Sequence, residues 1–143
     1  MLQNISLQIR FTNIEDKVNL KFQDYRDERG QYDHIISIEM FEAVGEEYWD
    51  SYYQQLKALL KPGGRAGLQI ITMNDHTFEY YKLHPDFIQR YIFPGGMLPS
   101  PSKLEQLRKD LGLKAAGLRL FPQDYARTLA DWRITFWERW QDI

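Results

Sequence analysis

The chain has 143 residues, of which 43% are hydrophobic and 27% charged, a balance typical of one globular domain. Its net charge of −2 creates no basic field for a phosphate backbone, so we expect no nucleic-acid partner. The absence of cysteine excludes disulfides and thiolate metal sites, and it favours a reducing, cytoplasmic location.

Aromatic residues are the one compositional excess, at 15% of the chain. Two interpretations stay open: packing within a core, or an apolar pocket or face that meets lipid. The sequence contains no apolar run near the roughly 20 residues that span a bilayer. Residues 1–11 also lack the basic and long apolar regions of a signal peptide.

Hydrophobic patterns alternate between strand and helix along the first half of the chain, which predicts an α/β fold with largely parallel strands. Residues 18–22 alternate apolar and polar side chains as a short strand does, and residues 33–38 fit a strand buried on both faces. Residues 46–61 predict a helix, because aromatic and leucine side chains recur every three or four residues until Pro62 ends the pattern.

The second half begins with a predicted strand over residues 65–72. Residues 75–101 carry four prolines and a glycine pair and are predicted to be irregular, except for a short helix over 86–92. Such long connections are often lids or binding segments. The remaining predicted elements are a helix over 102–111, a strand over 114–121 and an amphipathic helix over 125–140. No boundary interrupts this order, so residues 1–143 are predicted to form a single domain.

Polar residues stand just beyond the predicted strands, at Asp24, Glu42 and Thr72. Ligands of open parallel sheets bind at the edge where the strands end, so these residues are candidates for function. Each carboxylate is also compatible with a solvated loop position. Gln69 lies inside the apolar run 68–71, where its amide either bonds to nearby backbone or points at a ligand above the sheet.

Other chemistry finds little support in the residues. His34, His76 and His84 lack the spacing of metal ligands, so no metal site is expected. The sequence has neither the Gly-x-Ser-x-Gly motif of a serine nucleophile nor a Gly-x-Gly-x-x-Gly phosphate loop.

Several motifs occur together and in order from about Lys17 to the end of the chain. They are Ile36-Ser37-Ile38-Glu39-Met40-Phe41-Glu42-Ala43-Val44-Gly45, Leu60-Lys61-Pro62-Gly63-Gly64, Tyr91-Ile92-Phe93-Pro94-Gly95-Gly96, and Asp124-Tyr125-Ala126-Arg127-Thr128-Leu129. With them the chain resembles the cyclopropane-fatty-acyl-phospholipid synthase and mycolic acid cyclopropane synthase family. The resemblance implies a truncated Rossmann-like sheet of a class I S-adenosylmethionine-dependent methyltransferase, with flanking helices.

The resemblance also implies a reaction and its residues. Family members transfer a methyl group from S-adenosylmethionine to a cis double bond of a phospholipid acyl chain at the membrane surface. A bound bicarbonate takes the proton as the ring closes. Carried over by motif, the catalytic residues that hold bicarbonate are Glu42, Gln69 and Tyr125. Many members have histidine at the position of Gln69, and an amide cannot titrate near neutral pH as imidazole can.

The same resemblance places the cofactor against Gln23, Asp24, Ser37 and Ile38, with Asp24 at the position that commonly binds the adenine amino group. The sequence lacks the family's glycine-rich turn and its following acidic or hydroxyl residue, and residues 1–13 match poorly. It also ends before the segment that supplies a cysteine to the bicarbonate site. We therefore expect the chain alone to bind S-adenosylmethionine very weakly or not at all.

Three interpretations stay open. The first is a lipid methyltransferase, as a fragment or a degraded gene product, in the cytoplasm or peripheral to the inner face of the membrane. The second is a related methyltransferase with a small-molecule substrate, because a scaffold does not fix its substrate. The third is a non-catalytic module that forms a homo-oligomer or binds lipid, since lost strands would expose a sheet edge that invites pairing.

Overall fold

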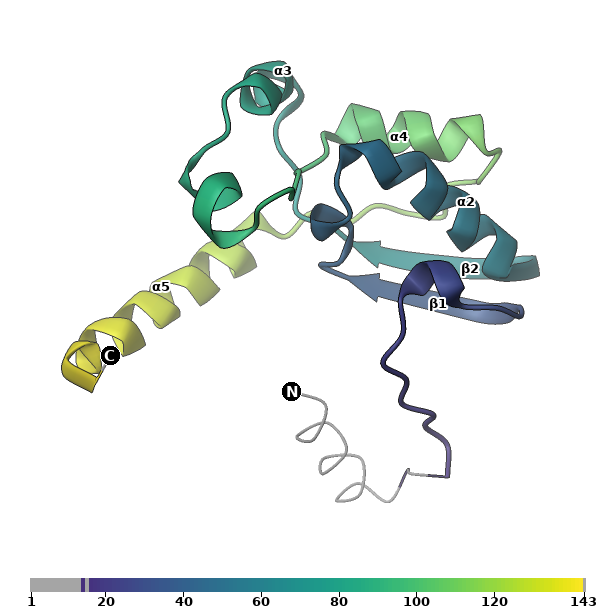
Figure 1. The fold of residues 1–143 in the computed structure, drawn as a ribbon, viewed down its shortest axis with the longest axis horizontal. Coiled ribbons are helices and arrows are strands. Elements are labelled where there is room, and N and C mark those ends of the chain that lie inside the picture. The colour runs from purple at the N-terminus through teal and green to yellow at the C-terminus, as the bar shows by residue number, and fades with distance from the viewer. Residues whose placement is uncertain (1–13, 15, 143) are drawn as a thin grey trace. The chain divides into compact units, whose positions relative to one another are not determined.

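The computed structural model describes residues 14 and 16–142. The chain divides into two compact units, and the division falls between Leu113 and Lys114. The first unit contains the sheet and three of the helices, and the second contains one long helix (Figure 1). Each unit is described by itself. The poor match to the family at residues 1–13 lies outside the described residues.

The sheet of the first unit consists of two parallel strands, β1 (Tyr32–Ile38) and β2 (Leu60–Gln69). The register pairs Ser37 with Leu68 and Ile38 with Gln69, so both strands end at the same edge. The strands predicted over 33–38 and 65–72 are therefore confirmed, with shifted ends. The strand predicted over 18–22 was wrong: that segment is irregular, because alternation alone cannot supply the neighbouring strand that a ladder requires.

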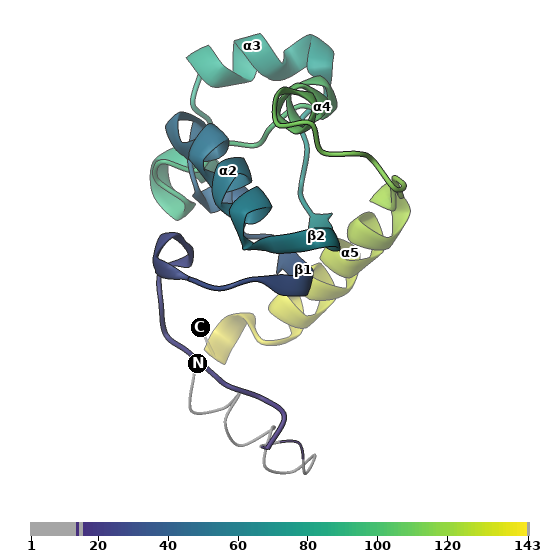
Figure 2. The ribbon, with the colours of Figure 1, turned by 90° about the vertical axis from the view of Figure 1, so that its right-hand side faces the viewer.

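Helix α2 (Trp49–Leu59) connects the two strands and covers one face of the sheet (Figure 2). Its buried residues Trp49, Tyr52, Tyr53 and Leu56 follow the three- and four-residue spacing that predicted the helix. The prediction that residues 33–38 are buried on both faces was wrong, because α2 covers one face only: alternate side chains of β1 are exposed, and Ile36 is 76% exposed. Two adjacent parallel strands need a crossover connection, and α2 supplies it between β1 and β2. The predicted order of strand, helix and strand therefore agrees with the structure.

Aromatic side chains form the core of the first unit. Phe41 is fully buried, and its ring centroid lies 5.3 Å from that of Trp49 and 5.0 Å from that of Tyr52. Helix α3 (Asp75–Leu83) adds Phe78, and α4 (Pro101–Asp110) adds Leu107. Part of the aromatic excess in this unit is therefore core packing, with ring pairs in edge-to-face and stacked arrangements. Other aromatic side chains of the unit are exposed, among them Phe22, Phe87, Tyr91 and Phe93.

The segment predicted to be irregular contains α3, and that part of the prediction was wrong. The helix begins where the Asn74 side chain accepts a hydrogen bond from the backbone N–H of His76, at 3.0 Å. A π-helical turn at Ile88–Ile92 follows and agrees with the short helix predicted over 86–92. Ser100 then caps α4 through its side chain, and Pro101 occupies the first turn, a position where proline is common because its missing N–H needs no partner.

The second unit begins with residues 114–121, which form no regular structure, so the strand predicted there was wrong as well. Helix α5 (Pro122–Glu138) follows and agrees with the helix predicted over 125–140. Near its end the rings of Phe136, Trp137 and Trp140 contact one another, with centroids 5.4–5.9 Å apart. Among the described residues, no helix is both long enough and apolar enough to cross a bilayer.

Candidate functional site

Glu42 lies directly beyond β1, in a 3-10 turn formed by Phe41–Ala43. Because Phe41 is fully buried in the aromatic core, the turn is fixed and the Glu42 side chain is directed toward the end of β2. There its Oε1 accepts the backbone N–H of Ile71 at 2.5 Å. Its backbone carbonyl accepts the N–H of Met97 at 2.9 Å, which joins the later loop to the same turn.

The second carboxylate oxygen of Glu42 is the unusual feature of this edge. Oε2 is buried and has no hydrogen-bond partner within residues 14 and 16–142. A buried polar atom without a partner is costly, and folded proteins contain few of them. A water or a ligand with a donor group would satisfy this oxygen. Trp49 Nε1 is the other buried polar side-chain atom without a partner among the described residues.

Gln69 is the last residue of β2 and half-buried. Its Nε2 donates to Glu39 Oε1 at 3.0 Å, and its backbone carbonyl accepts the N–H of Glu39 at 2.9 Å. The amide is thus bonded to a side chain, whereas the sequence suggested a bond either to nearby backbone or to a ligand above the sheet.

Glu39 follows β1 and was missed by sequence reasoning. Its φ of +47° makes it the one non-glycine residue with positive φ among the described residues. That conformation costs roughly 1–2 kcal/mol for a residue with a Cβ atom. An acidic residue after a strand was a visible signal, but its backbone conformation and its contact with Gln69 were not.

The structure therefore brings Glu42 and Gln69 to one edge of the sheet, since Glu42 bonds to Ile71, two residues after Gln69. Tyr125, the third residue predicted by motif, lies in the first turn of α5, in the second unit. Its participation stays a prediction. No cluster of three potential metal ligands occurs in the part of the chain that the structure describes.

Asp24 caps a 3-10 turn at Tyr25–Asp27, not the end of a strand. Its Oδ1 accepts the backbone N–H of Arg26 at 2.9 Å and the Nε–H at 3.0 Å, and its Oδ2 accepts from Nη2 at 2.8 Å. These Arg26 hydrogen bonds lower the pKa of Asp24 from 3.8 to about 2. The Arg26 guanidinium also lies 5.9 Å from the centre of the Tyr48 ring.

A shallow cavity of about 300 Å³ opens beside this turn, between it and the segment that follows β1. Its lining combines one ion pair with apolar and aromatic side chains: Asp24, Tyr25, Arg26, Met40, Ala43, Val44 and Tyr48. Ala43 belongs to the same 3-10 turn as Glu42, so the cavity and the Glu42 carboxylate share one structural element.

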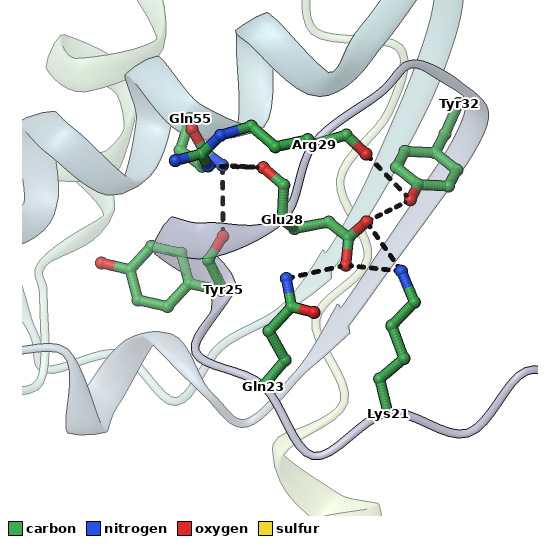
Figure 3. Close-up of polar contacts among 7 residues, drawn as sticks. All are labelled: Lys21, Gln23, Tyr25, Glu28, Arg29, Tyr32 and Gln55. Carbon is green, nitrogen blue, oxygen red and sulfur yellow. Dashed lines mark hydrogen bonds and ion pairs between the residues drawn. The ribbon is translucent and has the colours of Figure 1, made fainter.

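A polar network holds the Asp24 turn in place (Figure 3). Glu28 accepts hydrogen bonds from Tyr32 Oη at 2.6 Å, from Lys21 Nζ at 3.2 Å and from Gln23 Nε2 at 3.3 Å. The Tyr32 hydroxyl and Lys21 lower the pKa of Glu28. From α2, Gln55 Nε2 donates to the carbonyls of Tyr25 and Glu28, at 3.2 and 2.9 Å. The amide of the predicted cofactor residue Gln23 thus anchors the turn.

Ser37 and Ile38, also predicted to lie against the cofactor, are at the end of β1. Ser37 Oγ accepts a hydrogen bond from Tyr52 Oη at 2.7 Å, and burial raises the pKa of Tyr52. Ile38 is 63% exposed on the face opposite α2. Their contact with a cofactor stays a prediction.

Comparison with solved structures agrees with this architecture. The mycolic acid cyclopropane synthase CmaA1, crystallised with SAH and CTAB, superimposes with a TM-score of 0.74 at 23% identity. The match covers 91% of this chain and 50% of that one, and it shows the α/β fold. The cyclopropane synthase MmaA2 from Mycobacterium tuberculosis superimposes with a TM-score of 0.72 at 21% identity, over 90% of this chain and 50% of that one.

Sequence comparison shows the family. The tuberculostearic acid methyltransferase UfaA1 of Mycobacterium tuberculosis is 40% identical over 124 residues, which cover 86% of this chain and 29% of the relative. The cyclopropane-fatty-acyl-phospholipid synthase of Escherichia coli K12 is 34% identical over 127 residues, 88% of this chain and 32% of the relative. The chain thus spans about a third of these relatives. The model of the family "Mycolic acid cyclopropane synthetase" matches residues 3–143, and the chain belongs to that family.

Proposed function

We propose that this chain forms the acyl-chain and proton-acceptor part of an S-adenosylmethionine-dependent fatty acid methyltransferase. The reaction is methylene addition across a cis double bond of phospholipid acyl chains, at the cytoplasmic face of the membrane. The buried, unpartnered Oε2 of Glu42 carries the proposal, because a carboxylate oxygen in that position requires a donor. Family membership and the edge that Glu42 shares with Gln69 support it.

The residues at the sheet edge fit bicarbonate. A carboxylate repels an anion unless one of them carries a proton, and the hydroxyl of bicarbonate provides the donor that Glu42 Oε2 lacks. Gln69 Nε2 has a second N–H beyond the one given to Glu39, and it is free to donate to an anion oxygen. Tyr125 would add a phenol donor by motif. When bound, bicarbonate supplies a base at this edge.

The residues around the cavity are compatible with the adenosyl part of S-adenosylmethionine, which supplies the methyl group when bound. Asp24 accepts only from Arg26 among the described residues, and a carboxylate has lone pairs for a further donor such as an adenine amino group. Met40, Val44 and Tyr48 offer apolar contact to a planar ring.

A chimera tests the proposal: residues 14–142 replace the matching segment of the E. coli synthase. We expect labelled methyl groups from S-adenosylmethionine to enter the lipid fraction of vesicles with cis-unsaturated phospholipids. Label in a small molecule alone would overturn the lipid substrate. If the chimera binds the cofactor by calorimetry and unfolds cooperatively but transfers no methyl group to any acceptor, the proposal fails.

The isolated chain provides a second measurement. Calorimetric titration with S-adenosylmethionine should give no measurable heat, since most of the family's cofactor site has no counterpart in the sequence. Micromolar affinity would contradict this expectation and would show that the chain holds the cofactor unaided. Light scattering of the same sample tests the third interpretation, in which the chain forms a homo-oligomer.

A further inference from the structure

Glu39 makes two separate contacts with the residue that ends the neighbouring strand. Its backbone N–H donates to the Gln69 carbonyl at 2.9 Å, and its side-chain Oε1 accepts from Gln69 Nε2 at 3.0 Å. The positive φ of Glu39, +47°, redirects the chain between the end of β1 and the turn that carries Glu42.

The contact fixes which way the amide of Gln69 points. An ionised carboxylate only accepts hydrogen bonds, so the NH₂ group must face Glu39 and the amide oxygen must face away from it. One N–H of Gln69 is then left to donate at the edge where the Glu42 carboxylate lies. Without Glu39, the Gln69 amide could rotate by 180° about its Cγ–Cδ bond. This rotation would place the amide oxygen, an acceptor, where the N–H donor now faces the edge.

The pairing is hard to explain by stability. The hydrogen bond is solvent-exposed, and exposed bonds of this kind contribute little to folding. A residue with a Cβ atom is also strained at positive φ, where glycine or asparagine is tolerated better.

We propose that Glu39 is a positioning residue, which holds the Gln69 amide so that it donates toward an anion held at Glu42. The anion rests on the proposed function, whereas the orientation of the amide does not. The two parts can therefore be tested separately.

NMR of the ¹⁵N-labelled full chain, without added anion, tests the orientation. In the original protein and in Glu39→Gln, whose amide oxygen still accepts, we expect the two side-chain amide proton signals of Gln69 to be displaced from the values of a freely rotating glutamine. In Glu39→Gly and in Glu39→Asn, which is one methylene too short, the signals should move to the values of a freely rotating glutamine. The control Glu47→Gln removes an exposed carboxylate on the nearby 3-10 turn and should leave them unchanged.

Thermal unfolding separates positioning from support of the fold. Glu39→Gly should unfold at the same temperature or higher, because glycine relieves the strain. Unchanged Gln69 signals in Glu39→Gly and Glu39→Asn would overturn the proposal. So would signals that change only in variants with a lowered melting temperature.

Titration with sodium bicarbonate then tests the anion. We expect Glu39→Gly to need roughly tenfold more bicarbonate than the original protein or Glu39→Gln for the same shift of the Gln69 signals. Equal requirements would overturn the role of Glu39 toward the anion. If no protein responds, the anion site of the proposed function fails in this chain, whereas the orienting role is still judged from the signals without bicarbonate.

Discussion

The two polar regions of the first unit differ in how completely the protein satisfies them. Among the residues predicted to contact the cofactor, Asp24 is bonded through both oxygens to Arg26, and Ser37 is bonded to Tyr52. At the sheet edge, Glu42 has one oxygen bonded to Ile71 and one buried without a partner. The difference shows where the described residues leave a buried acceptor without a donor, and it yields predictions that substitution can test.

The largest effect is expected for Glu42→Gln. An amide oxygen still accepts the N–H of Ile71, so the fold should persist, but Oε2 is replaced by a donor that meets the donor of the ligand. We expect methyl transfer by the chimera to fall by about 100-fold or more, which is comparable to removing an oxyanion-hole donor. Rate assays with saturating cofactor measure it.

The control is Glu47→Gln, which removes an exposed carboxylate five residues away and should leave the rate within about twofold. If Glu42→Gln retained nearly full activity while unfolding at an unchanged temperature, the unpartnered oxygen would have no role in catalysis. The contrast between the two regions would then disappear.

A smaller effect is expected for Tyr52→Phe in the satisfied region. The substitution keeps the ring in the aromatic core but leaves Ser37 without its donor, which should cost about 1 kcal/mol of unfolding free energy. Urea denaturation of the chain measures this loss, and Tyr53→Phe serves as a hydroxyl control on the same helix. A large loss of methyl transfer by the corresponding chimera, without a loss of stability, would place Ser37 among the catalytic groups.

The smallest effect is expected for Asp24→Asn and depends on pH. Arg26 lowers the pKa of Asp24 from 3.8 to about 2, so the pair stabilises the fold fully above about pH 4 and loses that effect as the pH falls toward 2. Because both groups are largely exposed, the difference in Tm should be small at pH 6 and should vanish near pH 2. A difference that grew with acidity would contradict this assignment.

The sequence predicted those helices and strands that are determined by the residue pattern of their own segment. Helix α2 was visible from the spacing of its aromatic residues, and β1 from its compact apolar run. Neither of the two segments wrongly predicted as strands, the alternating residues 18–22 and residues 114–121, finds a pairing partner in the described structure. Helix α3 was missed because prolines near it outweighed the Asn74 cap.

The candidate site was predicted in part for the same reason. Motifs gave Glu42 and Gln69, and parallel strand order placed both at one edge. No sequence signal showed that Arg26 occupies both oxygens of Asp24, or that Glu39 adopts a positive φ and contacts Gln69. Those contacts depend on backbone geometry that forms only after the strands have paired.

The loop after β2 is clamped at both of its ends. Met73 donates its N–H to the Pro99 carbonyl at 2.9 Å, and Met97 donates to the carbonyl of Glu42 at the same distance. Residues 74–96, which include α3 and the π-helical turn, thus leave and return at nearly one point. Phe78 of α3 packs in the aromatic core, so this residue ties the excursion to the unit. Because the entropy of closing a loop changes slowly with its length, the part between α3 and Gly96 can differ in length while the carboxylate beneath the base of the loop stays where it is.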